Sequence, residues 1–466
     1  MILTLMVVNV SFGQTEKHEN KIVAENFVEK YNNNDYKAIF LMFAEVMQNA
    51  SPIDKTTEFL TGLKAQAGNI TNREFVKYEN GNFASYKTTF ERAVLSLNIS
   101  IDNNSKINEF LVKPFVEENN SENVINNLSK NELITKEQTE IVFNKVKPFP
   151  NNTKISIAII KNGKVNYYGI KRNNDTIYTS ENYKSIFEIG SISKVFTSTL
   201  LAGFITDKKI KLNDNINDYL NLSFHNGIKI SFKELANHTS GLPALPTNLD
   251  LTAVNPENPY KEYNKTNLEE YLTKNLELSN KGKYQYSNLG AGLLGYTLSN
   301  ISNVSYDSLL HSKIFSKYNM LNSTTSVNKI NSTLIKGLDN KGNKVSNWEF
   351  SVLVGAGGIL STVEDLSKFA ITQFNNSNKE LELTRQKTFE INDNMDIGLG
   401  WHILKSQSKN LWYWHNGGTG GYSSSMVIDT KTKNGIIILS NVSGFSPNMG
   451  NIDKLCFELM KTLEKK

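Results

Sequence analysis

Cysteine is almost absent from this chain, which contains one, Cys456, in 466 residues. One cysteine cannot close a disulfide within the chain, and it has no companion for a thiolate metal site. The stretch DKLCFELMKTL around it has the apolar spacing of a helix near the C-terminus. Cys456 is therefore expected to be a small buried apolar residue, and the stability of the protein must come from its core.

Long apolar runs and an excess of charge are also missing. No run reaches the roughly 18 residues that a transmembrane helix needs, so no membrane anchor is expected. The 51 basic and 46 acidic residues leave a net charge of +5. This is too small over such a length to indicate a nucleic-acid partner, and it provides no polybasic patch for a membrane surface.

Metal and nucleotide motifs are missing as well. His18, His225, His311 and His402 show no metal-ligand spacing. The glycine-rich GGTGG at 417–421 follows a strand pattern but opens no helix, unlike a dinucleotide or phosphate loop. We therefore expect neither a metal nor a cofactor.

Residues 1–14, MILTLMVVNVSFGQ, are apolar and then become small and polar. This order is typical of the end of a secretory signal peptide, here cleaved near Gly13 or Gln14. The basic segment that opens such peptides is missing, so we interpret 1–14 as a truncated signal peptide. Export to the periplasm or to the outside of the cell follows from this interpretation.

Residues 20–117 predict a separate small α+β domain. Helical patterns come first, at 20–33, 36–50 and 54–66, and Ile22, Val23, Phe27 and Val28 share one face of the first. Strand-like runs follow, at 74–80, 83–91, 93–101 and 107–115. Helices before a strand meander indicate helices packed on one face of an antiparallel sheet. The pattern resembles the cone-shaped, cystatin-like or nuclear-transport-factor-like domains that precede bacterial hydrolase domains, and we interpret it as an accessory or binding module.

The rest of the chain predicts a linker and a larger domain. Residues 118–134 are polar and rich in asparagine, which is typical of a linker. The domain from 135 to 466 opens with a helix and two strands joined by Asn162-Gly163, a strong hairpin signal. It closes with three strand patterns in 411–442 and the helix around Cys456, and its middle is mostly helical. Strands from both ends that share one sheet, with helices between them, predict a mixed α/β architecture.

The stretch FEIGSISKVFT at 187–197 contains Ser191 three positions before Lys194. An apolar helical run follows, so Ser191 is expected at the N-terminus of a helix, where the dipole and unpaired N–H groups favour negative charge. Residues three apart share a helical face. A lysine whose pKa is lowered by burial can take the proton of a serine hydroxyl and make it a nucleophile.

Spacing alone does not distinguish this pair from two polar residues on a helix. Ser326 and Lys329 have the same spacing, as do Ser406 and Lys409. Neither of these pairs is followed by an apolar helix, so the context of Ser191 carries the interpretation.

Two later stretches supply that context. Tyr286-Ser287-Asn288 stands before a helix that begins with glycines. It is either a loop tyrosine with a capping asparagine, or a phenol or phenolate that relays a proton while Asn288 donates hydrogen bonds.

The second stretch is His415-Asn416-Gly417-Gly418, which opens a glycine-rich strand. Glycine weakens a strand interior and often marks close approach of a ligand to the backbone. The N–H of Gly418 can then face a reacting carbonyl oxygen as part of an oxyanion hole. The alternative is a flexible turn.

In this order, Ser191-x-x-Lys194, Tyr286-x-Asn288 and His415-x-Gly417 resemble the motifs of serine β-lactamases and penicillin-binding proteins, in their class C-like branch. Three flanking phrases agree with that branch: ELANHTSGLP, GAGGILSTVEDLSKFA and GLGW. The resemblance covers about residues 135–465. It implies a β-lactamase/transpeptidase-like fold, with an antiparallel sheet flanked by helices, an all-helical region, and the site between them.

The resemblance also implies roles for individual residues. Ser191 is similar to the acylated nucleophile, Lys194 to its proton acceptor, and Tyr286 to the general base that also protonates the leaving group. Asn288 is similar to the residue that contacts the substrate amide. His238, in the phrase NHTSGLP, takes a structural role in this family rather than one in a Ser-His-Asp triad.

The last strand of the site is similar too. The backbone N–H groups of Ser191 and Gly418 correspond to the oxyanion hole, and His415 and Gly417 line the site. Lactamases of this branch usually carry lysine and then a hydroxyl residue before the glycine, and that pair helps to bind a substrate carboxylate. A histidine with a pKa near 6.5 is protonated only about a quarter of the time at pH 7, and Asn416 offers an amide. Carboxylate recognition is therefore expected to be weakened or conditional.

The sequence thus predicts an exported serine hydrolase that acts through an acyl-enzyme on amide or ester bonds. D-amino-acid peptidase, esterase and β-lactam hydrolase activities all fit, with a small-molecule, peptide or ester substrate such as a cell-wall peptide. Two alternatives stay open. One is a penicillin-recognising sensor that is acylated without turnover, and the other is a non-catalytic binding protein that works through its N-terminal unit.

Overall fold

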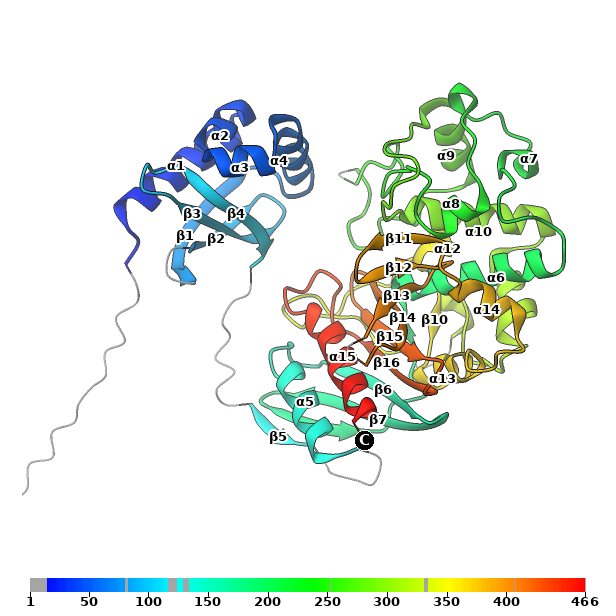
Figure 1. Cartoon of the computed structure of the whole chain (residues 1–466). Coiled ribbons are helices and arrows are strands. Elements are labelled where there is room, and N and C mark those ends of the chain that lie inside the picture. The colour runs from blue at the N-terminus through cyan, green and yellow to red at the C-terminus, as the bar shows by residue number, and fades with distance from the viewer. Residues whose placement is uncertain are drawn as a thin grey trace, which may run out of the picture. The chain divides into compact units, whose positions relative to one another are not determined.

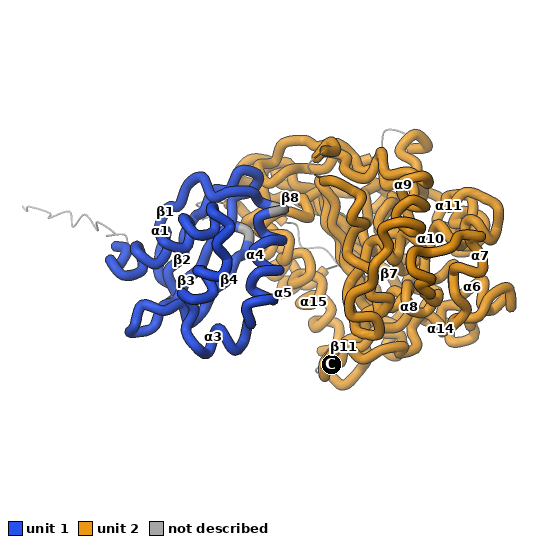
Figure 2. The backbone as a smooth tube through the Cα atoms, turned by 90° about the horizontal axis from the view of Figure 1, so that it is seen from above, with its two compact units in different colours: residues 1–118 blue, residues 119–466 orange. Residues whose placement is uncertain are grey.

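The computed structural model describes residues 15–79, 83–115, 124–128, 134–251, 253–330, 334–406 and 408–465. The chain divides into two compact units, 1–118 and 119–466, which Figure 2 colours separately. The signal peptide predicted at 1–14 lies outside the described residues. Within the described ranges, no helix is long and apolar enough to cross a membrane, and no cluster of His, Cys, Asp and Glu is arranged to hold a metal ion.

Unit 1 packs helices against one face of an antiparallel sheet. Its helices are α1 (His18–Asn32), α2 (Tyr36–Met42), α3 (Glu45–Ala50) and α4 (Ile53–Ala67). Its strands are β1 (Ile70–Glu79), β2 (Phe83–Phe90), β3 (Val94–Ile101) and β4 (Ile107–Pro114), paired in that order. Phe27 and Tyr31 of α1 share a core with Tyr86 and Leu97 of the sheet. The helices and the strand meander lie where the sequence predicts them.

Two details of unit 1 differ from the prediction. The helix expected at 36–50 is broken at Phe43, which is buried and forms an isolated bridge with Ile107 of β4. Ile22 is 43% exposed, and the buried face of α1 is Val23, Ala24, Phe27 and Tyr31. Val23, Phe27 and Tyr31 follow the i, i+4, i+8 spacing of one helical face, and Ala24 borders it on the side of Tyr31. Ile22 lies about 100° from Val23 on the opposite side.

Within the described part of unit 2, ten strands form one sheet. They are ordered β11-β12-β13-β14-β15-β16-β6-β7-β8-β5 and are antiparallel except at the pair β5–β8. Their bounds are β5 (Ile125–Asn127), β6 (Lys154–Lys161), β7 (Lys164–Asn173), β8 (Thr176–Ser180), β11 (Phe389–Asn392), β12 (Met395–Ile397), β13 (His402–Lys405), β14 (Leu411–Gly418), β15 (Ser423–Asp429) and β16 (Asn434–Ser440). Strand β5 lies inside the segment interpreted as a linker. The pairing of β16 with β6 joins the two ends of the domain, as the sequence predicts.

The sheet is covered on both faces. Helices α5 (Lys136–Val146) and α15 (Gly450–Glu464) lie together on one face, as Figure 1 shows. Helices α6 (Ser193–Thr206) and α13 (Val363–Thr372) share a core with the other. Along β6, Ile155, Ile157 and Ile159 point to the first core, whereas Ala158 and Ile160 point to the second. Cys456 is fully buried in α15, as expected.

A helical region lies beyond α6. Its helices are α7 (Asn217–Leu220), α8 (Phe232–Ala236), α9 (Lys265–Glu270), α10 (Asn288–Ser302), α11 (Tyr306–Leu310), α12 (Val354–Gly357) and α14 (Lys379–Arg385). Two short strands, β9 (Phe187–Glu188) and β10 (Leu360–Ser361), pair beside the start of α6. Helix α6 contacts α8, α10, α12 and α14 and is apolar and buried on nearly all sides. A helix that is apolar all round is a core helix, and its N-terminus is thereby held at the boundary between sheet and helical region.

Candidate active site

Ser191 lies in a 3₁₀ turn, Gly190–Ile192, directly before α6. Gly190 has a φ of +52°, a left-handed conformation that glycine adopts without strain. A Cβ on Gly190 would also lie 2.7 Å from the backbone nitrogen of Gly418. Glycine is therefore needed here for two reasons, and it presents Ser191 at the end of a buried helix.

Lys194 lies one turn further along and is 2% exposed. Its Nζ is 2.8 Å from Oγ of Ser191, 2.7 Å from Oδ1 of Asn288 and 2.7 Å from the carbonyl oxygen of Ala356. None of these partners carries a negative charge. Burial accordingly lowers the pKa of Lys194 well below its usual value, because the ammonium loses its hydration.

A neutral amine fits this set of contacts. It has two N–H donors and one lone pair, and Asn288 and Ala356 offer two acceptors. The lone pair is then left for the hydroxyl proton of Ser191. The structure thus brings together the serine and lysine that the sequence singles out, in the geometry of a nucleophile and its base.

Tyr286 stands beside this pair. Nζ of Lys194 lies 4.9 Å from the centroid of its ring. Burial raises the pKa of Tyr286, and a hydrogen bond with Ser191 opposes this shift without cancelling it. The phenol is therefore favoured over the phenolate, which the sequence had left open. Tyr286 therefore holds its proton at neutral pH, whereas the lowered pKa of Lys194 favours an amine that is free to accept one.

His238 supports the tyrosine motif. Its Nδ1 accepts a hydrogen bond from the backbone N–H of Ser287 at 3.2 Å, and its ring lies 4.6 Å from that of Tyr286. Ser287 in turn caps α10, because its Oγ accepts from the N–H of Gly290 at 2.9 Å. These contacts agree with a structural role for His238. They hold Tyr286 and Asn288 beside Lys194.

Strand β14 has an open edge next to the nucleophile. β13 pairs with residues 411–414 of β14, whereas β15 pairs with residues 413–418. The N–H of Thr419 donates to the carbonyl oxygen of Tyr422 at 2.9 Å. Since successive N–H groups of a strand point to opposite edges, the N–H of Gly418 points away from β15, toward the open edge.

Gly417 lets this edge approach the turn that carries Ser191. A Cβ on Gly417 would lie 2.2 Å from the carbonyl oxygen of Ile189 and 2.8 Å from the nitrogen of Ser191. Such distances exclude any side chain. The backbone nitrogens of Ser191 and Gly418 therefore lie close together, an arrangement in which two N–H groups can bind one carbonyl oxygen.

His415 lies on the site face of β14 and is 1% exposed. Its ring is 6.4 Å from that of Tyr286 and 5.3 Å from that of His402. Nδ1 lies 2.6 Å from the carbonyl oxygen of Asn416 and so carries the proton. Burial, reinforced by His402 and Lys194, lowers the pKa of His415 well below its usual value. His415 is thus neutral at pH 7, and the fraction of charge expected from the sequence is too high.

Asn416 does not face the site. Neighbouring residues of a strand point to opposite faces of the sheet, and the Nδ2 of Asn416 donates to Oδ2 of Asp453 on α15 at 2.8 Å. The amide that the sequence offered to a substrate carboxylate is therefore engaged on the far side of the sheet. Neither His415 nor Asn416 presents a charge or a donor of the kind that a carboxylate needs.

Acid is expected to destabilise unit 2 through His402. Burial lowers the pKa of His402 to about 4, against about 6.5 in an unfolded chain. Below pH 6.5 the unfolded state therefore binds more protons than the folded state, so stability falls as the pH falls toward 4. From pH 7 to pH 5 this one group should cost about 2 kcal/mol of unfolding free energy.

Urea unfolding followed by tryptophan fluorescence tests this expectation, because all four tryptophans lie in unit 2. His402→Gln should make the pH profile less steep, while the exposed His18 provides the matched control, His18→Gln. An equally steep profile in the His402 variant would show that other groups cause the acid sensitivity.

Some residues at the site carried no motif in the sequence. The carbonyl of Ala356 belongs to the phrase GAGGILS, but its contact with Lys194 depends on where α12 packs. Glu188 is buried three positions before Ser191, and its Oε1 accepts from Nδ2 of Asn347 at 2.7 Å and from the N–H of Trp348 at 2.9 Å. No local signal pairs residues 160 positions apart, so sequence reasoning could not find this link.

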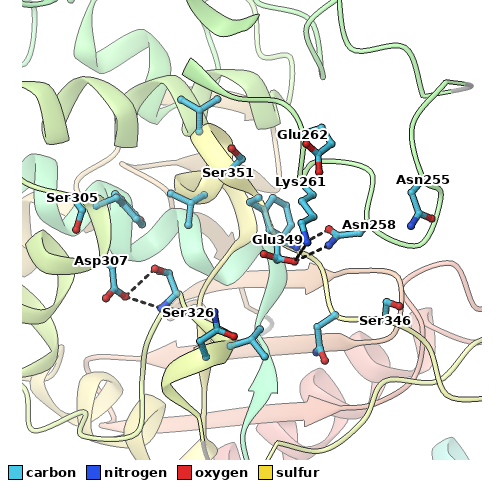
Figure 3. Close-up of a pocket in the computed structure, with 18 of the residues that line it drawn as sticks. Asn255, Asn258, Lys261, Glu262, Ser305, Asp307, Ser326, Ser346, Glu349 and Ser351 are labelled. Atoms are coloured by element: carbon cyan, nitrogen blue, oxygen red, sulfur yellow. Dashed lines mark hydrogen bonds and ion pairs between the residues drawn. The ribbon is translucent and has the colours of Figure 1, made fainter. Parts of the chain in front are cut away.

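A hollow of about 1000 Å³ lies between the loop at 254–262 and residues 346–354 (Figure 3). Lys261 and Glu349 in its lining form an ion pair at 3.0 Å. Its lining includes Asn347 and Phe350 but none of the four residues Ser191, Lys194, Tyr286 and His415. The hollow adjoins the site, but the residues expected to react do not line it.

Comparison with known proteins identifies the larger unit. Residues 144–455 match the family model described as Beta-lactamase. The chain belongs to the beta-lactamase family. Residues 24–110 match a second model, described as a protein of unknown function, DUF3887. The predicted fold class is thereby confirmed: a β-lactamase/transpeptidase-like domain preceded by a small nuclear-transport-factor-like α+β domain.

Curated relatives are similar to part of this chain. Protein flp of Staphylococcus aureus (strain MRSA252) is 24% identical over 308 residues, which cover 62% of this chain and 59% of that protein. A protein named Beta-lactamase from Pseudomonas fluorescens is 27% identical over 261 residues, 53% of this chain and 69% of the relative. The match thus spans less than two thirds of the staphylococcal relative.

Solved structures share the fold of the larger unit. An octameric penicillin-binding protein homologue from Pyrococcus abyssi aligns with a TM-score of 0.59 and 22% identity, over 71% of this chain and 77% of that one. A structure named Beta-Lactamase/D-Alanine Carboxypeptidase, from Pseudomonas syringae, aligns with a TM-score of 0.58 and 19% identity, over 70% and 97%. Family membership supports a serine-hydrolase type of function in broad terms.

Proposed function

We propose that this beta-lactamase-family protein is a serine hydrolase that forms an acyl-enzyme on Ser191 with an ester or amide substrate. The observation that carries the proposal is the 2.8 Å contact between Oγ of Ser191 and Nζ of Lys194, a buried amine without an acidic partner among its contacts. A serine hydroxyl becomes a nucleophile when such a base takes its proton.

The reaction would proceed in two halves. Oγ of Ser191 attacks the carbonyl carbon while Lys194 takes the hydroxyl proton, and the N–H groups of Ser191 and Gly418 stabilise the oxyanion. As the tetrahedral intermediate collapses, Tyr286 gives its proton to the leaving group and regains one from Lys194. Water then attacks the ester on Ser191, with the same groups acting in reverse, and releases the acid.

The neutral state of His415 limits the range of substrates that we expect. A carboxylate that entered beside it would lose its hydration without gaining a charged partner at this position. This favours esters and amides without a carboxylate next to the scissile bond. We therefore expect neutral esters to be better substrates than β-lactams or peptides that end in D-alanine.

The test is a screen of the purified protein against short-chain p-nitrophenyl esters, a D-alanyl-D-alanine peptide and nitrocefin. Ser191→Ala should abolish turnover and labelling by a fluorophosphonate. Ser326→Ala removes the serine of a pair with the same spacing and should change neither. Labelling that survives in Ser191→Ala would refute the proposal, and labelling of the wild type without steady turnover would point to a covalent sensor.

A further inference from the structure

An aromatic cluster lies beyond the glycine-rich end of β14. Trp348 packs on Gly420 so closely that a Cβ there would lie 2.6 Å from its Nε1. The rings of Phe445 and Tyr260 lie 5.9 Å and 5.2 Å from that of Trp348, and Tyr260 stacks on Phe350 at 5.0 Å. We call Tyr260, Trp348, Phe350 and Phe445 the aromatic wall.

The aromatic wall is tied to the catalytic backbone at two points. Glu188, three residues before Ser191, accepts a hydrogen bond from the N–H of Trp348 at 2.9 Å. On the other side, the N–H of Gly444 donates to the carbonyl oxygen of Thr419 at 2.9 Å, directly before Phe445. The wall is therefore held against the same segments that carry the nucleophile and the oxyanion donor Gly418.

The direction of the substrate follows from β14. Tyr286 lies near His415 at one end of the open edge, and Trp348 lies over Gly420 at the other. When the N–H of Gly418 binds a carbonyl oxygen between them, the two groups on the carbonyl carbon extend in opposite directions along this edge. The leaving group must reach Tyr286 to receive a proton, so the acyl group extends toward the aromatic wall.

The exposed surface of the aromatic wall is apolar and can contact an apolar acyl group. Phe445 is 66% exposed although it touches Trp348. Because Phe445 packs beside the Trp348 ring, the two side chains offer an apolar surface that a substrate group can cover. Aromatic groups also gain from offset or edge-to-face packing with one another.

We propose that the aromatic wall binds the acyl group of the substrate and selects esters and amides whose acyl group carries an aryl or another bulky apolar substituent. This inference rests on the proposed acyl-enzyme function. It adds the class of acyl group and assigns specificity to Trp348 and Phe445, which take no part in proton transfer.

Two substrate series test it. In the first, acetyl, butyryl and phenylacetyl esters share the p-nitrophenol leaving group. In the second, acetyl esters carry different phenols. For the wild type we expect kcat/KM for phenylacetyl to exceed that for acetyl by about tenfold or more. Phe445→Ala and Trp348→Leu should each lower this ratio by about three- to tenfold and leave the order of the phenol series unchanged.

Phe59→Ala is the matched control, since it removes a half-exposed aromatic side chain from unit 1. Ser191→Ala distinguishes failure of the proposed function from failure of this inference. Activity that persists in Ser191→Ala overturns the proposed function itself. Loss of activity in Ser191→Ala, with an acyl ratio unchanged in both wall variants, overturns this inference alone. The exposure of Phe445 keeps that variant folded even where Trp348→Leu disturbs its loop.

Discussion

Replacement of Lys194 by methionine is expected to slow acylation by about 10³-fold, within the range found for general-base catalysis. Methionine keeps the length and burial of the side chain but removes the lone pair that takes the proton of Ser191. Single-turnover hydrolysis of a p-nitrophenyl ester measures this step. Lys329→Met, in the pair with the same spacing at Ser326, should leave the rate unchanged.

The fold is expected to survive this change, because two effects oppose each other. The lowered pKa of Lys194 shows that burial of the ammonium is unfavourable, and methionine removes that cost. Against it, Oδ1 of Asn288 and the carbonyl of Ala356 lose a donor, at roughly 1–3 kcal/mol for each group that stays buried. Tryptophan fluorescence of the urea transition would show whether a loss of rate reflects unfolding.

Tyr286→Phe tests whether Tyr286 acts as the general acid or as the general base. p-Nitrophenolate leaves without a proton, so this variant should lose little rate on p-nitrophenyl esters and about 10²-fold on alkyl esters or amides. Equal losses on both kinds of substrate would instead make Tyr286 the base. Turnover within tenfold of the wild type in Lys194→Met would remove the lysine from the mechanism.

Gly417→Ala is expected to lower kcat by about 10²–10³-fold, the cost of losing one oxyanion-hole donor. The added Cβ would meet the carbonyl oxygen of Ile189 and the nitrogen of Ser191, both of them backbone atoms that cannot rotate away. The strand or the nucleophile turn must therefore shift, and the N–H groups of Ser191 and Gly418 separate. KM for a small ester should change much less than kcat, since the oxyanion forms only during the reaction.

Gly62→Ala is the control for a glycine-to-alanine change that meets no neighbour. Gly62 lies inside α4 with no heavy atom within 4 Å of the added Cβ. It should leave kcat unchanged and stabilise unit 1 by up to about 1 kcal/mol, since alanine favours a helix. Wild-type kcat in Gly417→Ala would show that the oxyanion is held by other groups.

Local patterns in the sequence determined much of this protein. Apolar spacing and turn residues located the helices and strands of unit 1 and the hairpin at Asn162-Gly163. The order of three short motifs was enough to indicate the family, which the comparisons confirmed. These inferences worked because helix and strand periods, turn chemistry and motif order are all written within short stretches of chain.

The electrostatics of the site were decided by tertiary structure. His415 looked partly charged at neutral pH, but packing against His402 and Tyr286 buries it and keeps it neutral. Asn416 looked like a substrate contact, but the alternation of β14 and the position of α15 turn it toward Asp453. The pKa of a side chain depends on neighbours from distant parts of the chain, and no local pattern records them.

The sequence by itself thus singled out the residues that we expect to carry the chemistry, and the fold decided which of them lie together and how far burial shifts their pKa values. Burial lowers the pKa of Lys194 because α6 is buried on nearly all sides and the partners of its amine, Asn288 and Ala356, are uncharged. The aromatic wall exists only because Glu188 and Gly420 meet Trp348 across 160 and 72 positions of chain. Burial and long-range packing are properties of the folded chain, and they set both the reactivity of the site and the acyl group we expect it to prefer.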